Sequence, residues 1–155
     1  MSWLKKNTKT ERKASAPAPA SQGGQAGMDQ MVRMLAAAPE DRRTMMLGDR
    51  LAVFAGQDEA SRERAMKGML AAALQLPEDG YRKIAASRFK ALNGLDADTR
   101  MTLMKSHAAV VKSLPADQQQ REMKTMKQIV SALPEAERGR MMAMMQNLGL
   151  MGEAG

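Results

Sequence analysis

Six helix-start signals recur every nineteen residues, and this spacing constrains the fold more than any other feature of the chain. The markers are Pro39, Asp58, Pro77, Asp96, Pro115 and Pro134. Most are followed within two residues by an acidic side chain. Proline is favoured at the first helical position, and carboxylates in the first turn interact well with the positive end of the helix dipole. Each unit is therefore predicted to begin a helix at its marker.

Within each unit, apolar residues recur at helical spacing after the marker. They stand seven to eight, eleven and fourteen to fifteen residues on, which is the stripe of an amphipathic helix. This spacing predicts one helix of roughly 13–14 residues per unit, joined to the next by a short connection. A further helix is predicted at 28–38. Short connections favour antiparallel neighbours, so two units form a 38-residue helical hairpin.

The predicted fold is therefore all-α, with helical-hairpin repeats forming either a short α-solenoid or a compact helical bundle. The composition agrees, because only four of the 155 residues are aromatic while the strong helix formers are abundant. No apolar run approaches the ~18 residues needed to span a bilayer. The charged N-terminus lacks the apolar segment of a secretory signal, and the absence of Cys fits a reducing compartment. A cytoplasmic location is expected.

Three segments are predicted along the chain. Residues 1–27 contain two prolines, a Gly-Gly pair and little to bury, which is typical of a flexible tail. Residues 28–152 form a single helical domain, and residues 153–155 are expected to be disordered. The tail holds five basic residues and one acidic residue, so it carries +4 of the net charge of +7.

No catalytic or metal-binding pattern appears in the sequence. The chain has no Cys nucleophile, no phosphate-cradling Gly-rich loop and no metal-spaced His/Glu cluster. His107 is the only histidine, and it stands where other units have Met69 and Met145. We interpret it as a histidine in or beside a core position, without a visible partner for acid–base chemistry. The chain is therefore expected not to be an enzyme, and to need no cofactor or metal.

Three arginines, Arg62, Arg100 and Arg138, lie 38 residues apart at the fourth position after a marker. In a stacked solenoid they would form a ladder along one edge, able to hold an acidic peptide, a phosphate-bearing ligand or an RNA backbone. The alternative, which we favour, is local pairing with the acidic residue three or four positions earlier in the same helix. Such pairs contribute only ~0.2–0.5 kcal/mol each.

Seventeen methionines are present, and the last unit concentrates them. Most lie on the apolar stripe, where Met fills gaps in a core. The last helix differs because Met141, Met142, Met144 and Met145 cover most of its circumference. Two readings follow: an exposed, pliable surface that binds a partner helix, or a helix wedged deep into the bundle.

The predicted function is that of a protein-binding adaptor, assembly factor or regulator. Its candidate surfaces are the last helix through Met141, Met142 and Met145, the edge with the three arginines, and the tail around Trp3, Lys5 and Lys6. The partner would be an apolar helix or an acidic segment of another protein, and a homodimer is equally compatible. The alternative is association with nucleic acid or an anionic membrane through the basic tail and the arginines.

Overall fold

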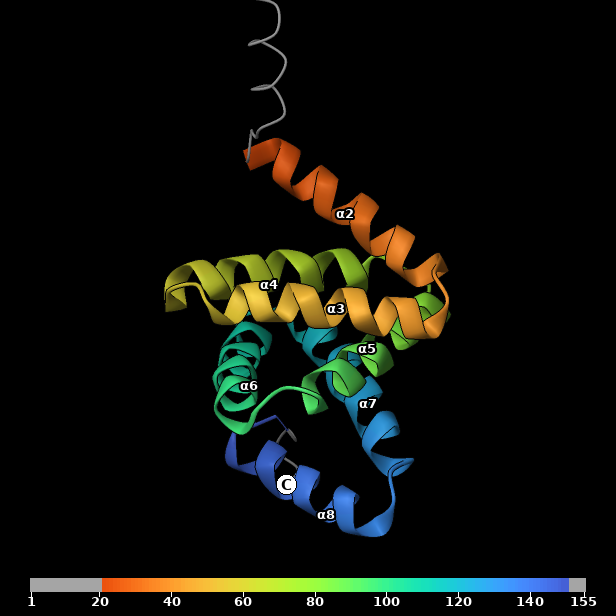
Figure 1. The fold of residues 1–155 in the computed structure, drawn as a ribbon, viewed down its shortest axis with the longest axis vertical. Coiled ribbons are helices and arrows are strands. Elements are labelled where there is room, and N and C mark those ends of the chain that lie inside the picture. The colour runs from red at the N-terminus through yellow and green to blue at the C-terminus, as the bar shows by residue number, and fades with distance from the viewer. Residues whose placement is uncertain (1–20, 151–155) are drawn as a thin grey trace, which may run out of the picture.

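The computed structural model describes residues 21–150, with side-chain detail from residue 24 onward, and all of its regular structure is helical. The all-α prediction is therefore confirmed for this part of the chain (Figure 1). The helices are α2 (Ser21–Ala37), α3 (Glu40–Ala55), α4 (Glu59–Leu74), α5 (Glu78–Asn93), α6 (Ala97–Lys112), α7 (Ala116–Ser131) and α8 (Glu135–Asn147).

Each helix from α3 to α8 begins one residue after its marker, so the nineteen-residue series does define the helix starts. The markers occupy the N-cap position, one residue earlier than the first helical position that we predicted for proline. The Asp58 side chain accepts a hydrogen bond from the Ser61 N–H at 2.7 Å, and Asp96 accepts one from Thr99 at 3.4 Å. Aspartate thus satisfies a backbone donor that would otherwise lack a partner.

The helices are longer than predicted, because α3 to α7 have sixteen residues each and only three residues join them. Helix α2 begins at Ser21 rather than at 28. Residues 21–27, which we assigned to the tail, are therefore helical. Gln25 connects this first part of α2 to the domain, since its Nε2 donates to Asp29 at 3.0 Å and to the Gly68 carbonyl at 3.5 Å. The predicted tail at 1–20 and the C-terminal end lie outside the described residues.

The helices pack into a compact bundle, in which the most extensive interfaces join alternate helices. Helix α2 packs on α4, α3 on α5, and α4 on α6, whereas consecutive helices touch less. Buried hydrogen bonds repeat with the same step. Arg43 Nε donates to Ser87 Oγ at 2.9 Å, and Arg62 Nε donates to Ser106 Oγ at 2.8 Å. The repeating contact is therefore between a helix and the second helix after it.

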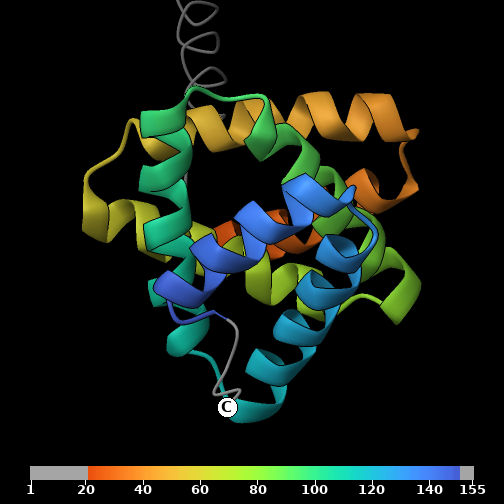
Figure 2. The same ribbon diagram turned by 90° about the horizontal axis from the view of Figure 1, so that it is seen from below.

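Helix α8 departs from this arrangement and crosses the face formed by α5, α6 and α7 (Figure 2). Only two of its residues, Met141 and Met145, are buried. Leu150 follows the helix and is also buried in the core. The last helix is consequently anchored by few side chains, and its remaining surface stays open. No helix within residues 21–150 is long and apolar enough to cross a membrane.

Candidate functional site

The residue four positions after each marker clamps the turn that precedes its own helix. In five of the six units this residue donates a hydrogen bond to the backbone carbonyl just before the marker. The bonds are Arg43 to Ala38 (2.7 Å), Arg62 to Gln57 (2.7 Å), Arg100 to Leu95 (2.7 Å), Gln119 to Leu114 (3.0 Å) and Arg138 to Leu133 (2.9 Å). These carbonyls lie at the end of the preceding helix, where helical partners are missing. The repeated arginine is a turn clamp.

This finding corrects both of our readings of Arg62, Arg100 and Arg138. Their guanidinium groups are partly buried and directed at the turns, so they do not form an open ladder along one edge. Local ion pairing is also wrong, because none of the three has a carboxylate within salt-bridge distance among residues 24–150. For each of these guanidinium groups, the backbone carbonyl of the adjoining turn is nearer than the solvated carboxylates on the outer face of the helix.

The unit that begins at Pro77 lacks the clamp, because Tyr81 stands at its fourth position. Arg121, from α7, supplies the guanidinium instead. Its Nη1 donates to the Leu74 carbonyl at 2.6 Å and its Nη2 to the Leu76 carbonyl at 2.9 Å. The same guanidinium lies 4.8 Å from the centre of the Tyr81 ring, which is a cation–π distance. A residue two units along thus replaces the local donor.

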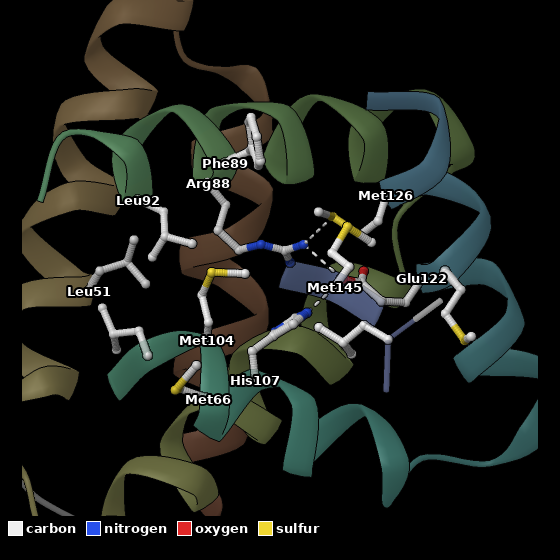
Figure 3. A pocket seen from close by; sticks show the side chains of 13 residues that line it. Leu51, Met66, Arg88, Phe89, Leu92, Met104, His107, Glu122, Met126 and Met145 are labelled. Atoms are coloured by element: carbon white, nitrogen blue, oxygen red, sulfur yellow. Dashed lines mark hydrogen bonds and ion pairs between the residues drawn. The ribbon is translucent and has the colours of Figure 1, made fainter. Parts of the chain in front are cut away.

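A polar cluster lies in the core beside this turn, centred on Glu122 of α7. The Glu122 side chain is only 1% exposed. Its Oε2 lies 2.8 Å from Arg88 Nη2 and 2.8 Å from His107 Nε2, while the Tyr81 hydroxyl donates to Oε1. Figure 3 shows Arg88, His107 and Glu122 converging from three helices. Buried charged groups are normally paired in this way, because an unpaired one is costly.

Burial shifts the pKa of all three ionisable groups in this cluster. It raises the pKa of Glu122 to about 8 and lowers the pKa of Arg88 to about 10. The pKa of His107 falls to about 3, first through burial and second through the nearby charge of Arg88. In each case the low-dielectric surroundings disfavour the charged form. His107 is therefore neutral at pH 7, whereas Arg88 keeps its charge.

Two small cavities, each of about 40 Å³, flank Arg88 and His107. Their walls are otherwise mostly Leu and Met side chains. Each has room for a few water molecules, since one water needs roughly 10–15 Å³ of such space. Both carboxylate oxygens of Glu122 already have hydrogen-bonding partners, and no Ser or Thr hydroxyl lines either cavity. The cluster thus joins α5, α6 and α7 and offers little to an outside reactant.

A larger groove of about 370 Å³ opens between α5, α6 and α8. Its volume lies within the usual range for ligand sites, roughly 300–1,000 Å³. Its apolar floor comes from Phe89, Leu133, Met141 and Met144, and its polar rim comes from Asn93, Arg100, Glu137 and Arg140. We call this surface the α8 groove. Apolar side chains surrounded by a polar rim are typical of surfaces that bind another protein.

The methionines of α8 divide between the core and the surface. Met145 is 1% exposed and Met141 is 9% exposed, whereas Met142 is 40% exposed and Met144 is half-buried. The prediction that Met145 contributes to an exposed partner surface is therefore wrong, whereas Met141 is mostly buried but still lines the α8 groove. A helix that lies on the bundle must bury one face, and these two residues, four apart, form that face. Met142 remains a candidate contact, and Trp3, Lys5 and Lys6 lie outside the described residues.

Sequence reasoning missed the polar cluster, although the repeat contained a signal for it. Glu122 stands seven residues after its marker, where the other units have Met46, Ala65, Ile84, Leu103 and Met141. Arg88 and His107 stand eleven residues after theirs, where three other units have methionine. An ionisable residue at a position that is apolar in every other unit, as at Glu122, indicates a buried polar contact. We placed His107 near the core correctly, but its partner Glu122 was not identified.

No known protein family, curated protein or solved structure matches this chain. Within the part of the chain that the structure describes, no three His, Cys, Asp or Glu side chains gather as a metal site would require.

Proposed function

We propose that this protein is a non-enzymatic adaptor or regulator that binds another protein through the α8 groove. The observation that carries the proposal is the groove itself, because it joins an apolar floor to charged side chains at its rim. Helix α8 supplies both kinds of residue and lies across the outside of the bundle (Figure 2). Methionine suits such a floor, since its flexible and polarisable side chain adapts to different partners.

The internal satisfaction of the polar cluster supports a non-enzymatic role. Glu122 is held by Tyr81 and Arg88, and His107 is directed at the same carboxylate. A general base must reach a proton of the substrate, and a nucleophile usually stands beside it. Here the carboxylate is almost fully buried and its neighbours are donors from the protein. The cluster is better suited to holding three helices together.

The test compares partner capture by the wild type and by two groove variants, using the full chain as bait in cells that produce it naturally. Met144→Asp places a charge on the apolar floor, and Arg140→Glu reverses a charge on the rim. Each should remove most of the same specific partner. Met34→Asp is the matched control, because Met34 is 60% exposed on α2, away from the groove. It should retain the partner.

Circular dichroism must show that both groove variants keep the helical content and cooperative unfolding of the wild type. If a partner is retained equally by wild type, Met144→Asp and Arg140→Glu, the α8 groove is not the binding surface. Loss of the partner with Met34→Asp alone would move the surface to α2. Variants of Met141 and Met145 are unsuitable for this purpose, because both side chains are buried and their loss would disturb the fold.

A further inference from the structure

We infer that the α8 groove selects a segment of a partner protein in which carboxylates flank an apolar anchor. This inference rests on the proposed function and specifies the partner of the same site. It starts from the charges on the rim, where two arginines stand against one glutamate. Arginine recognises carboxylates through pairs of parallel N–H donors, and these charge-assisted bonds are among the stronger ones in proteins.

Arg100 differs from Arg43 and Arg62 in what its remaining donors meet. In Arg43 and Arg62 the Nε donates to a serine hydroxyl 44 residues later. The residue 44 positions after Arg100 is Met144, which has no hydroxyl and lines the same groove. Among the side-chain nitrogens of Arg100, only Nη1 has a hydrogen bond to another described residue, and this bond goes to the Leu95 carbonyl. At the position where Arg43 and Arg62 find a serine acceptor, Arg100 faces an apolar methionine. Its Nε and Nη2 donors are therefore left for an acceptor outside the protein.

Arg140 provides the second charge, from the opposite wall of the groove on α8. Its side chain has no hydrogen bond or ion pair with any other residue of 24–150, and it is exposed. Glu137 lies one helical turn before it on the same helix and also lines the groove. A carboxylate of the partner is therefore attracted to Arg100 and Arg140 and repelled by Glu137, so the charges on the rim favour carboxylates on balance.

The apolar floor distinguishes a protein segment from a nucleic acid. Phe89, Met141 and Met144 offer contact to an aliphatic or aromatic side chain, whereas a nucleic-acid surface requires a longer row of basic residues. Two arginines would neutralise about two phosphates, which gives weak binding with a shallow salt dependence. Carboxylates beside an apolar anchor match both parts of the groove.

The test uses three short fluorescein-labelled helical peptides with the same Leu and Phe anchors. The flanking positions carry Glu in the first, Gln in the second and Lys in the third. Fluorescence anisotropy with the full chain should show the Glu peptide binding about tenfold more tightly than the Gln peptide, and the Lys peptide binding most weakly. Arg100→Gln and Arg140→Gln should each weaken the Glu peptide about fivefold and leave the Gln peptide unchanged.

Glutamine at position 100 is a matched replacement, because Gln119 performs the same turn contact in another unit. Arg82→Gln is the control, since Arg82 lies on α5 and pairs with Glu78 and Asp79 outside the groove. It should change none of the affinities. Met144→Asp should weaken both the Glu and the Gln peptides, because it acts on the floor.

The outcomes separate this inference from the proposed function. Equal affinities for the Glu and Gln peptides, both weakened by Met144→Asp, would overturn the acidic selection while the groove remained a docking site. Peptide binding that is insensitive to Met144→Asp would overturn both. The inference also fails if phosphatidylserine vesicles or single-stranded RNA bind more tightly than the Glu peptide and lose that binding in Arg100→Gln and Arg140→Gln.

Discussion

The turns before α4 and before α5 both have backbone carbonyls that accept hydrogen bonds from an arginine, but the two arginines come from different parts of the chain. The turn before α4 is clamped from within its own unit, by Arg62, which also donates to Ser106. The turn before α5 has Tyr81 at that position and is clamped from α7, by Arg121. The first solution needs only the local repeat and one serine. The second depends on a helix two units later, and it brings a phenol into the core.

The buried Tyr81 requires a chain of further polar contacts in the core. The tyrosine is fully buried, so its hydroxyl needs a partner, and it donates to Glu122. A buried carboxylate in turn needs donors, which Arg88 supplies and to which His107 is adjacent. The comparison teaches that one departure from the repeat is accommodated by a connected set of polar residues: Glu122 stands at a position that is apolar in every other unit, and Arg88 and His107 stand at a position that is methionine in three units.

The largest expected effect comes from returning this cluster to the apolar pattern of the other units. Glu122→Met should lower the free energy of unfolding by about 3–5 kcal/mol, because it leaves Arg88 and the Tyr81 hydroxyl without their acceptor. Arg88→Met should cost a similar amount. The double variant should recover most of the loss, since it replaces both buried polar side chains with the methionine found at these positions in other units. Urea unfolding of the four proteins measures this cycle.

Glu137→Met serves as the control, because Glu137 is exposed on α8 and should change stability little. Additive losses in the double variant would show that Glu122 and Arg88 do not depend on each other. The cluster would then not be the connected set that the geometry indicates.

A second prediction concerns pH, to which the buried cluster around Glu122 should respond more strongly than the exposed N-cap carboxylates of Asp58 and Asp96, whose pKa values are lowered by hydrogen bonds to Ser61 and Thr99. The pKa of Glu122 rises from 4.5 to about 8 on folding, so its stabilising contribution is complete below pH 4.5 and is lost as the pH rises to about 8. The pKa of His107 falls from 6.5 to about 3, so its contribution is present above pH 6.5 and is lost as the pH falls to about 3. Each limb should change stability by on the order of 5 kcal/mol.

Denaturant unfolding between pH 3 and 9 should therefore show greatest stability at mildly acidic pH. Glu122→Gln should flatten the alkaline limb, and His107→Gln should flatten the acidic one. An alkaline limb that is unchanged in Glu122→Gln would assign that titration to another group.

The third prediction compares clamps within the regular region. Arg43 is 6% exposed and donates to Ser87 and Ala38, whereas Arg100 is half-buried and donates only to Leu95. Arg43→Ala should cost about 2–3 kcal/mol and leave Ser87 without its donor. Arg100→Ala should cost about 1 kcal/mol. Thermal unfolding of both variants tests the order, and equal losses would contradict the structural difference between the two arginines.

The units that clamp their own turns could be predicted from sequence in part, whereas the turn at Tyr81 and the polar cluster around Glu122 could not. The reason is physical. Helix starts depend on local chemistry, so the markers placed Glu40 and Glu59 within one residue of the predicted starts. The turn clamp joins residues five apart, yet the arginine was assigned to a carboxylate, because sequence spacing does not show which acceptor is closer. Contacts such as Tyr81 with Glu122 span 41 residues and depend on how the helices pack.

The candidate groove shows the same limit. The excess of methionine in α8 indicated that one face could not bury all of them. Met142 is indeed exposed, whereas Met145 is buried. Which pair would be buried depended on the direction in which α8 crosses the bundle. Arg140 carried no repeat signal at all, and its place in the groove follows only from that crossing.

The smallest expected effect is a gain, from restoring arginine where α7 has lost it. Gln119 clamps its turn with an uncharged amide, which donates to Leu114 at 3.0 Å and more weakly to Lys112 at 3.3 Å. Gln119→Arg should stabilise the protein by about 0.5 kcal/mol, because a charged donor forms a stronger bond to the same carbonyl. Chemical denaturation of the variant against Gln119→Ala, which should lose about 1 kcal/mol, measures both directions. If arginine is no better than alanine at this position, the clamp contributes nothing to stability there, and the regular units are held by their alternate-helix contacts alone.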